Sequence, residues 1–280
     1  MLTLQKVTKR YGKKEVLADV SLTIEPGEFV CIVGASGAGK TTLLSLLIGA
    51  ENPSGGTVEV DGVDLRIIPQ TAMRLYRRRV GMVFQDRKLL PHRTVAENAA
   101  FPLEAGEASD KLIRKRVPAV LGYLGLAGKG RAFPRELSAG EQARVALARA
   151  IIHKPAILLA DEPLVDLDPA QAKLVLKVLR DLHAMGSTVI LATHNAELAE
   201  ALGARTITLK DGRAYDSARG QETSNIAAEE AKIRRNAAPQ GQPESSRKVE
   251  DPVADPERSR GERSRGEQSR RVRITSIGAL

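Results

Sequence analysis

Short apolar runs alternate with amphipathic segments along most of the chain. Residues 1–33 alternate in the manner of strands, with a turn at 25–27. Continuous apolar runs at 28–33, 157–160 and 188–192 are typical of central parallel strands, which are buried on both faces. Helical patterns cover 41–48, 170–185 and, punctuated by prolines, much of 92–150. This alternation predicts an α/β fold with a doubly wound parallel sheet, and any ligand should lie at the carboxyl ends of its strands.

A glycine-rich loop connects the apolar run 28–33 to the helical segment after it. Residues 34–41 read GASGAGKT, the pattern of a P-loop, whose backbone N–H groups turn toward a polyphosphate at a helix N-terminus. Lys40 would contact the β- and γ-phosphates, and the Thr41 hydroxyl would bind Mg²⁺. The sequence therefore predicts a site for a nucleoside triphosphate. Its loop residues are Gly34, Ala35, Ser36, Gly37, Ala38, Gly39, Lys40, Thr41 and Thr42.

Two adjacent carboxylates follow the apolar run 157–160. Asp161 stands at the expected tip of that strand, where a carboxylate can organise Mg²⁺. Glu162 is then placed to act as the general base on an attacking water. Such a pair is often only a solvated turn, but here it belongs to a chain that also carries a P-loop. ATP and Mg²⁺ are the expected ligands.

A third motif, LSAGEQ at residues 137–142, opens an amphipathic helical segment. Taken alone, Ser138 and Glu141 form an ordinary capping box. Together with the P-loop and the acidic strand, the motif resembles the signature of the ATP-binding-cassette (ABC) ATPases. The resemblance covers residues 1–216. It implies a P-loop NTPase core with a parallel sheet, an N-terminal antiparallel β part and a helical signature subdomain at about 86–150.

The resemblance also implies roles for individual residues. Tyr11 matches the aromatic residue that stacks on adenine, Gln85 the glutamine that senses Mg²⁺ and the γ-phosphate, and His194 the histidine that contacts the γ-phosphate. Residues 167–168 end the D-loop. Ser138, Gly140 and Glu141 would complete the ATP site of a second copy in a head-to-tail homodimer.

Residues 84–98 resemble the FtsE group of cell-division ATPases, which work with the membrane protein FtsX. That likeness implies a peripheral ATPase on the cytoplasmic face of the plasma membrane, attached through an FtsX-like integral membrane subunit and signalling to peptidoglycan hydrolases. One alternative is the ATPase of a lipoprotein-releasing or efflux system. Another is a soluble ABC protein that acts on nucleic acid or ribosomes.

Three features depart from the family pattern. Ala139 replaces the usual glycine of the signature, and its methyl group would crowd the γ-phosphate or strain the loop. Residues 164–168 read LVDLD where relatives usually have TGNLD. A charged segment, 217–280, follows the ATPase domain; it includes near-repeats at 257–271 and is expected to be disordered.

The charge and composition of the chain limit the class of partner that it can bind. The net charge is +9, but aromatic residues make up only 3% of the chain and none is interleaved with the basic clusters at 77–79 and 114–116. This favours a solvated or membrane-facing surface over nucleic acid. The single cysteine, Cys31, agrees with a reducing compartment, and no signal peptide or membrane span is expected.

Overall fold

The computed structural model describes residues 1–218 and 221–222, so almost all of the segment predicted to be disordered lies outside the described residues. The N-terminal part forms a small antiparallel sheet, as predicted. Its strand order is β2-β1-β4-β5. The strands are β1 (Leu2–Tyr11), β2 (Lys14–Ile24), β4 (Gly55–Val60) and β5 (Val63–Asp64).

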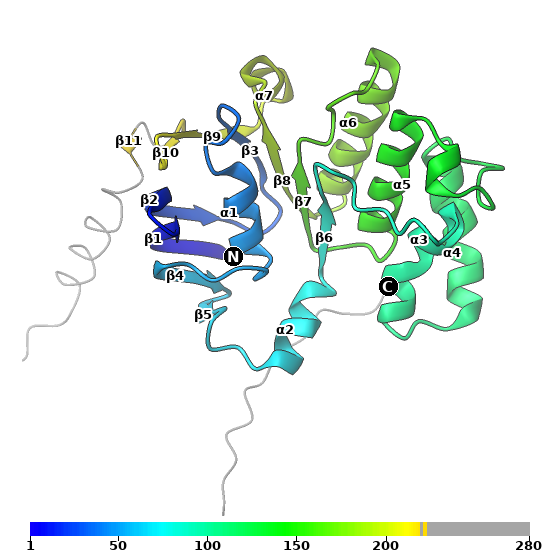
Figure 1. Ribbon diagram of the computed structural model, residues 1–280, viewed down its shortest axis with the longest axis horizontal. Helices are drawn as coiled ribbons and strands as arrows, with labels where there is room; N and C mark the ends of the chain where they lie inside the picture. The colour runs from blue at the N-terminus through cyan, green and yellow to red at the C-terminus, as the bar shows by residue number, and fades with distance from the viewer. Residues whose placement is uncertain (219–220, 223–280) are drawn as a thin grey trace, which may run out of the picture. The chain divides into compact units, whose positions relative to one another are not determined.

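A seven-stranded sheet forms the centre of the ATPase part (Figure 1), in the order β11-β10-β9-β3-β8-β7-β6. Its parallel strands are β9 (Arg205–Lys210), β3 (Phe29–Val33), β8 (Thr188–Thr193), β7 (Ile157–Asp161) and β6 (Val80–Val83). Two antiparallel strands, β10 (Arg213–Asp216) and β11 (Gln221–Glu222), extend one edge. The predicted parallel sheet is confirmed. The sheet also continues past residue 216, where the sequence places the end of the domain.

Helices cover this sheet and build the signature region. Helix α1 (Lys40–Leu47) leads from β3 to β4 of the antiparallel sheet, whereas α6 (Pro169–Ala184) and α7 (Ala196–Leu202) connect parallel strands of the large sheet. The predicted helical stretch contains α3 (Val95–Ala105), α4 (Asp110–Tyr123), a 3₁₀ turn (Pro134–Glu136) and α5 (Ala139–Ile151). Pro102 and Pro118 lie inside α3 and α4 rather than between them. The sequence analysis did not predict α2 (Gln70–Arg77).

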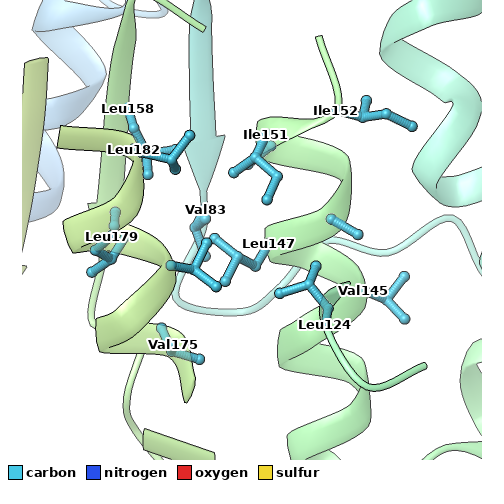
Figure 2. Close-up of a cluster of buried hydrophobic side chains, with 14 of the residues drawn as sticks. Val83, Leu124, Val145, Leu147, Ile151, Ile152, Leu158, Val175, Leu179 and Leu182 are labelled. Carbon is cyan, nitrogen blue, oxygen red and sulfur yellow. The ribbon is translucent and has the colours of Figure 1, made fainter. Parts of the chain in front are cut away.

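The two faces of the sheet bury separate hydrophobic clusters. Alternate residues of β8 show this division, because Val189 and Leu191 belong to one cluster while Ile190 belongs to the other. Figure 2 shows the first cluster, in which side chains of α5 and α6, among them Leu147 and Leu179, meet those of β6 and β7. Each such side chain contributes about 1.5–3 kcal/mol on burial. This packing fixes the strand ends that carry the polar residues.

Two further expectations concern the core and the membrane. Cys31 is fully buried in β3, as predicted for a small hydrophobic residue, and its burial raises the pKa of the thiol to about 11. None of the helices in the described part of the chain combines the length and apolar character that crossing a bilayer requires.

Candidate active site

Most of the predicted site residues, apart from Tyr11 and the signature residues, converge at the carboxyl ends of four neighbouring parallel strands. The P-loop follows β3, Gln85 follows β6, Asp161 and Glu162 lie at the end of β7, and His194 follows β8. A cavity of about 250 Å³ opens at this edge. It is lined by Val16, Ser36, Gly37, Gly39, Lys40, Thr41, Thr42, Gln85, Asp161 and Glu162. This is the edge where α/β folds bind their ligands.

Glycine is required in the P-loop at two positions. Gly39 has φ +104 and ends the loop at the first turn of α1. A Cβ atom there would lie 3.1 Å from the backbone oxygen of Val16, besides adopting a conformation that L-residues rarely take. Gly34 has no positive φ, but a Cβ atom would lie 2.6 Å from the carbonyl oxygen of Leu209. The loop can therefore follow this path only with glycine at both places.

The ammonium group of Lys40 is buried beneath the P-loop. Its Nζ donates hydrogen bonds to the carbonyl oxygens of Gly34 at 2.8 Å and Ala35 at 3.2 Å. The same Nζ lies 3.2 Å from Glu162 Oε1. The lysine charge is thus held beside the cavity by the acidic residue expected to act as the base.

Asp161 is 1% exposed and carries one oxygen that lacks a partner. Its Oδ2 accepts a hydrogen bond from Thr41 Oγ1 at 2.6 Å, whereas no described group bonds the buried Oδ1. Burial raises the pKa of this carboxyl above its ordinary value, although the bond from Thr41 opposes the rise. A buried oxygen without a donor, next to a hydroxyl, fits a Mg²⁺ ion, which prefers oxygen ligands. Gln85 lines the same cavity and adds an amide oxygen.

Glu162 has a left-handed backbone conformation, with φ +46, and its N–H donates to the carbonyl oxygen of Ala192 at 2.9 Å. Positive φ is uncommon for a residue with a side chain. The carboxylate lies between two groups, with Lys40 on Oε1 and His194 Nδ1 3.0 Å from Oε2. The histidine side chain is 62% exposed while that of Glu162 is 9% exposed. This geometry holds a nearly buried carboxylate at the cavity wall, in contact with an imidazole that solvent reaches.

The signature residues lie away from this cavity, at the start of α5. Ser138 Oγ accepts a bond from the Glu141 N–H at 3.2 Å, and Glu141 Oε2 accepts from the Ser138 N–H at 2.9 Å. This capping box, together with Lys129, lowers the pKa of Glu141. Ala139 is exposed and is the first helical residue of α5. Since Ala139 has no left-handed backbone, the expected strain on the loop is absent; the crowding of a partner's γ-phosphate stays a prediction.

Gly140 is buried where α5 meets α6. A Cβ atom at this position would lie 1.4 Å from Gln171 Oε1. Gln171 is in the first turn of α6, where Asp168 caps the helix through bonds from the N–H groups of Ala170 and Gln171 at 3.0 and 2.9 Å. A larger residue at this position would have to displace the side-chain amide of Gln171, which packs over the glycine between the two helix N-termini. The sequence analysis did not identify Gln171.

Tyr11 lies beside α1 but does not line the cavity. Its ring is under the Lys9 ammonium, with Nζ 5.0 Å from the ring centroid, and its hydroxyl bonds the carboxylate of Glu51. The side chain is 46% exposed. Stacking on adenine stays a prediction.

Arg149 is a further residue that the sequence analysis missed. Its guanidinium donates to the carbonyl oxygens of Lys88 at 2.6 Å and Arg87 at 2.8 Å, both of which have positive φ. Arg87 in turn lies 3.6 Å from Asp166 Oδ2 in the D-loop. The helix that starts at the signature thus holds the loop that follows Gln85. No sequence pattern distinguishes Arg149 from a surface arginine.

A second hollow, of about 530 Å³, lies next to the Gln85 loop between α2, β6, α3 and α5. Its floor is largely apolar and its rim is cationic. It is lined by Arg74, Arg77, Arg78, Val80, Gly81, Met82, Phe84, Lys88, Phe101, Pro102, Ala105, Arg149, Ala150 and His153. We refer to this hollow as the groove.

Comparison with known proteins agrees with this geometry. Residues 17–165 match the ABC transporter family. The chain belongs to that family. It is an ABC-type ATPase, and the nucleotide that it binds is ATP. It is 42% identical to the cell division ATP-binding protein FtsE of Bacillus subtilis, over 79% of this chain and 98% of that relative.

Other relatives and solved structures agree. The FtsE protein of Escherichia coli K12 is 42% identical over 77% of this chain and 97% of its own length, and that of Mycobacterium tuberculosis is 40% identical over 76% and 94%. Among solved structures, the dimeric post-hydrolysis state of the ATP-binding cassette MJ0796, bound to ADP and Pi, is 35% identical with a TM-score of 0.71. It covers 77% of this chain and 98% of its own. The predicted ABC ATPase fold is confirmed.

Proposed function

We propose that this chain is the ATP-hydrolysing subunit of an FtsEX-like complex in bacterial cell division. The observation that carries this proposal is 42% identity with FtsE over nearly the full length of that relative. The P-loop, Gln85 and the acidic pair Asp161 and Glu162 line one cavity. In such a complex, hydrolysis would drive a membrane subunit that activates peptidoglycan hydrolases, and no solute would be transported.

ATP binding uses the P-loop and Lys40. The β- and γ-phosphates would accept hydrogen bonds from the loop N–H groups and replace Glu162 as the partner of Lys40. Thr41, Asp161 and Gln85 would hold Mg²⁺, which neutralises phosphate charge when bound. Release from Lys40 leaves the Glu162 carboxylate to accept a proton from water, while His194 stays within hydrogen-bonding distance of it. The solvent-exposed side chain of His194 would contact the γ-phosphate.

The active form is a head-to-tail homodimer. The signature residues Ser138, Gly140 and Glu141 lie outside the cavity that holds Lys40, so within one chain they have no nucleotide to contact. A second copy turned to face the cavity would bring the N-terminus of its α5, with the positive end of the helix dipole, to the γ-phosphate. The dimeric MJ0796 cassettes are similar to this chain and support the arrangement.

The groove receives the FtsX-like membrane subunit. It borders the loop after Gln85, and Arg149 connects that loop to the signature helix. Its apolar floor, with Met82, Phe84 and Phe101, suits a short amphipathic helix. Motion of α5 would therefore be transmitted to the membrane subunit, which also attaches the ATPase to the cytoplasmic face of the plasma membrane.

Co-purification with the FtsX-like subunit in detergent tests the proposal. Ala105→Trp places an indole in the groove, whereas Ala119→Trp adds one at an exposed position of α4 outside it. We expect the first variant to lose the membrane subunit and the second to keep it, with both retaining ATP binding. Depletion of the protein in its host should give division-defective, elongated cells. Normal division, with failed lipoprotein release or efflux instead, would contradict the cell-division assignment.

A further inference from the structure

Helix α2 rests on the protein by one side only. It connects β5 to β6 (Figure 1), and none of its eight residues is fully buried. Ala72, Met73 and Tyr76 are half-buried and form the inner side. The side with the exposed residues carries Thr71, Arg74, Leu75 and Arg78, at the spacing of residues that share one helix face. Arg74 and Arg78 also form part of the rim of the groove. Apolar and cationic side chains are therefore presented together to solvent.

The charge of this region is one-sided. Between residues 65 and 85 the sequence has five arginines and no aspartate or glutamate. We call the outer side of α2 and the residues next to it the α2 surface. It consists of Arg66, Ile67, Thr71, Arg74, Leu75, Arg77, Arg78 and Arg79.

Few carboxylates offset these arginines. Arg66 pairs with Asp64 at 2.7 Å and lowers the pKa of that carboxyl, and Arg78 has only the exposed Glu107, at 3.9 Å. Within the described part of the chain, Arg74 and Arg79 form no ion pair. Arg77 is bound to the carbonyl oxygens of Ile48 and Gly49, which leaves its charge without a counterion there. The α2 surface therefore carries a net positive charge.

Two large apolar side chains stand among these charges. Ile67 is 75% exposed and Leu75 is 59% exposed, and neither lines the groove. A protein helix seated in the groove would therefore not cover them. Helices that lie in a membrane interface combine apolar side chains with arginines and lysines in this way.

We propose that the α2 surface binds anionic lipid directly. Guanidinium groups form bidentate hydrogen bonds with phosphate oxygens, and Ile67 and Leu75 would enter the boundary between headgroups and acyl chains. Nucleic acid fits less well, because the only aromatic residue here, Tyr76, is half-buried and its hydroxyl bonds the carbonyl oxygen of Leu47. An acidic protein would use the charges but leave the apolar side chains exposed. Arg74, Arg77 and Arg78 also line the groove, but binding of the protein alone to vesicles needs no membrane subunit, so this inference can fail independently of the proposed function.

A local fluorescence probe on the full-length protein tests this. Leu75→Cys is labelled with a polarity-sensitive dye, and the native Cys31 is fully buried, so labelling is selective. Met185→Cys is the matched control, because Met185 is 72% exposed and lies at the end of α6. With vesicles containing 30% phosphatidylglycerol we expect a blue shift at position 75 and none at 185. An unchanged spectrum at 75, or an equal shift with purely neutral vesicles, would overturn the proposal.

Charge variants provide a second measurement. Arg74→Glu with Arg79→Glu should lower the partition coefficient of the full-length protein onto the anionic vesicles by roughly tenfold or more. Arg114→Glu with Lys115→Glu makes the same change in net charge at exposed positions of α4 and should alter it less than about twofold. The difference should shrink as salt rises. Equal loss in the two pairs, or loss of an acidic protein partner with unchanged vesicle binding, would refute a lipid site at α2.

Discussion

The ammonium group of Lys40 lies 3.2 Å from the carboxylate of Glu162, so the phosphate-binding cation and the proposed base neutralise each other in the absence of nucleotide. Both side chains are nearly buried, at 7% and 9% exposure. A buried charge without a partner is costly, and the ion pair avoids that cost in both residues. ATP binding must therefore supply Lys40 with a new anion before the carboxylate can act on water.

Replacing the base should separate binding from turnover. Glu162→Gln keeps the shape of the side chain but removes the proton acceptor, so kcat should fall roughly 10²-fold or more. The variant should still bind ATP and accumulate as an ATP-bound dimer. Steady-state ATPase assays and size-exclusion chromatography check this. A kcat within about twofold of wild type would remove Glu162 from the role of base.

The buried carboxylate of Asp161 should lower the stability of the nucleotide-free protein. Because its pKa in the folded state is raised above the ordinary value of 3.8, the folded state holds this proton more tightly than the unfolded state. Its contribution to stability is therefore lost as the pH rises through the interval between the two values. At neutral pH, Asp161→Asn should raise the Tm of the nucleotide-free protein by about 2 to 4 °C, while Mg²⁺-dependent ATPase activity is lost.

Calorimetry from pH 4 to pH 8, without nucleotide, measures this effect. The gain from Asp161→Asn should be largest at the upper end of this range and small near pH 4. Thr41→Val is a useful contrast, because it removes the donor to Oδ2 and should lower the Tm. A variant of Asp161 that is less stable than wild type at pH 8 would contradict the argument.

Ala139→Gly should increase activity at a small cost in stability. Ala139 is exposed in the first turn of α5, so glycine should destabilise the protein by about 0.5 kcal/mol through backbone entropy. If the alanine methyl crowds the γ-phosphate in the partner's site, kcat should rise and ATP-dependent dimerisation should strengthen. Paired kcat and Tm measurements decide this, and a lower kcat in the glycine variant would exclude crowding.

Arg149→Lys should loosen the loop after Gln85. A lysine ammonium cannot replace the fork that holds the carbonyl oxygens of Arg87 and Lys88 together. Hydrogen exchange at residues 86–90 should become faster, while amides of β6 and β7 keep their protection. Exchange that remains unchanged throughout 86–90 would show that the loop does not depend on Arg149.

Removing residues 223–280 should leave the ATPase nearly unaffected. The described part of the chain already contains both sheets and every predicted nucleotide-binding residue, so Tm and kcat should stay close to wild type. The truncation ends after β11 to preserve its pairing with β10. A collapse of activity would show that the proposed domain boundary is wrong.

The sequence predicts those parts of the site that are continuous along the chain. The P-loop, the acidic pair and the signature each combine a buried strand or helix start with a few polar residues, so local pattern and chemistry coincide. Their meeting at one sheet edge follows from parallel strands having their carboxyl ends together. Gln171 and Arg149 could not be predicted in this way, because their contacts join segments distant in the sequence.

Helix α2 was missed for a different physical reason. Hydrophobic periodicity reports a buried face, and α2 has no buried residue to produce one. Pro102 and Pro118 show the opposite case, because proline predicts an interruption of a helix and both prolines lie within helices. In α3 and α4, tertiary packing therefore outweighs the low helix propensity of proline.

The close approach of Gly140 to Gln171 has a consequence for a dimer. The start of α5 would serve the nucleotide of one site, while the D-loop that leads into α6 would border the other. Because the side-chain amide of Gln171 packs directly over Gly140, a shift of one helix start would disturb a contact with the other. Two ATP molecules bound by a pair of such chains would then sense each other, and ATP hydrolysis should show a Hill coefficient above one that Gly140→Ala abolishes.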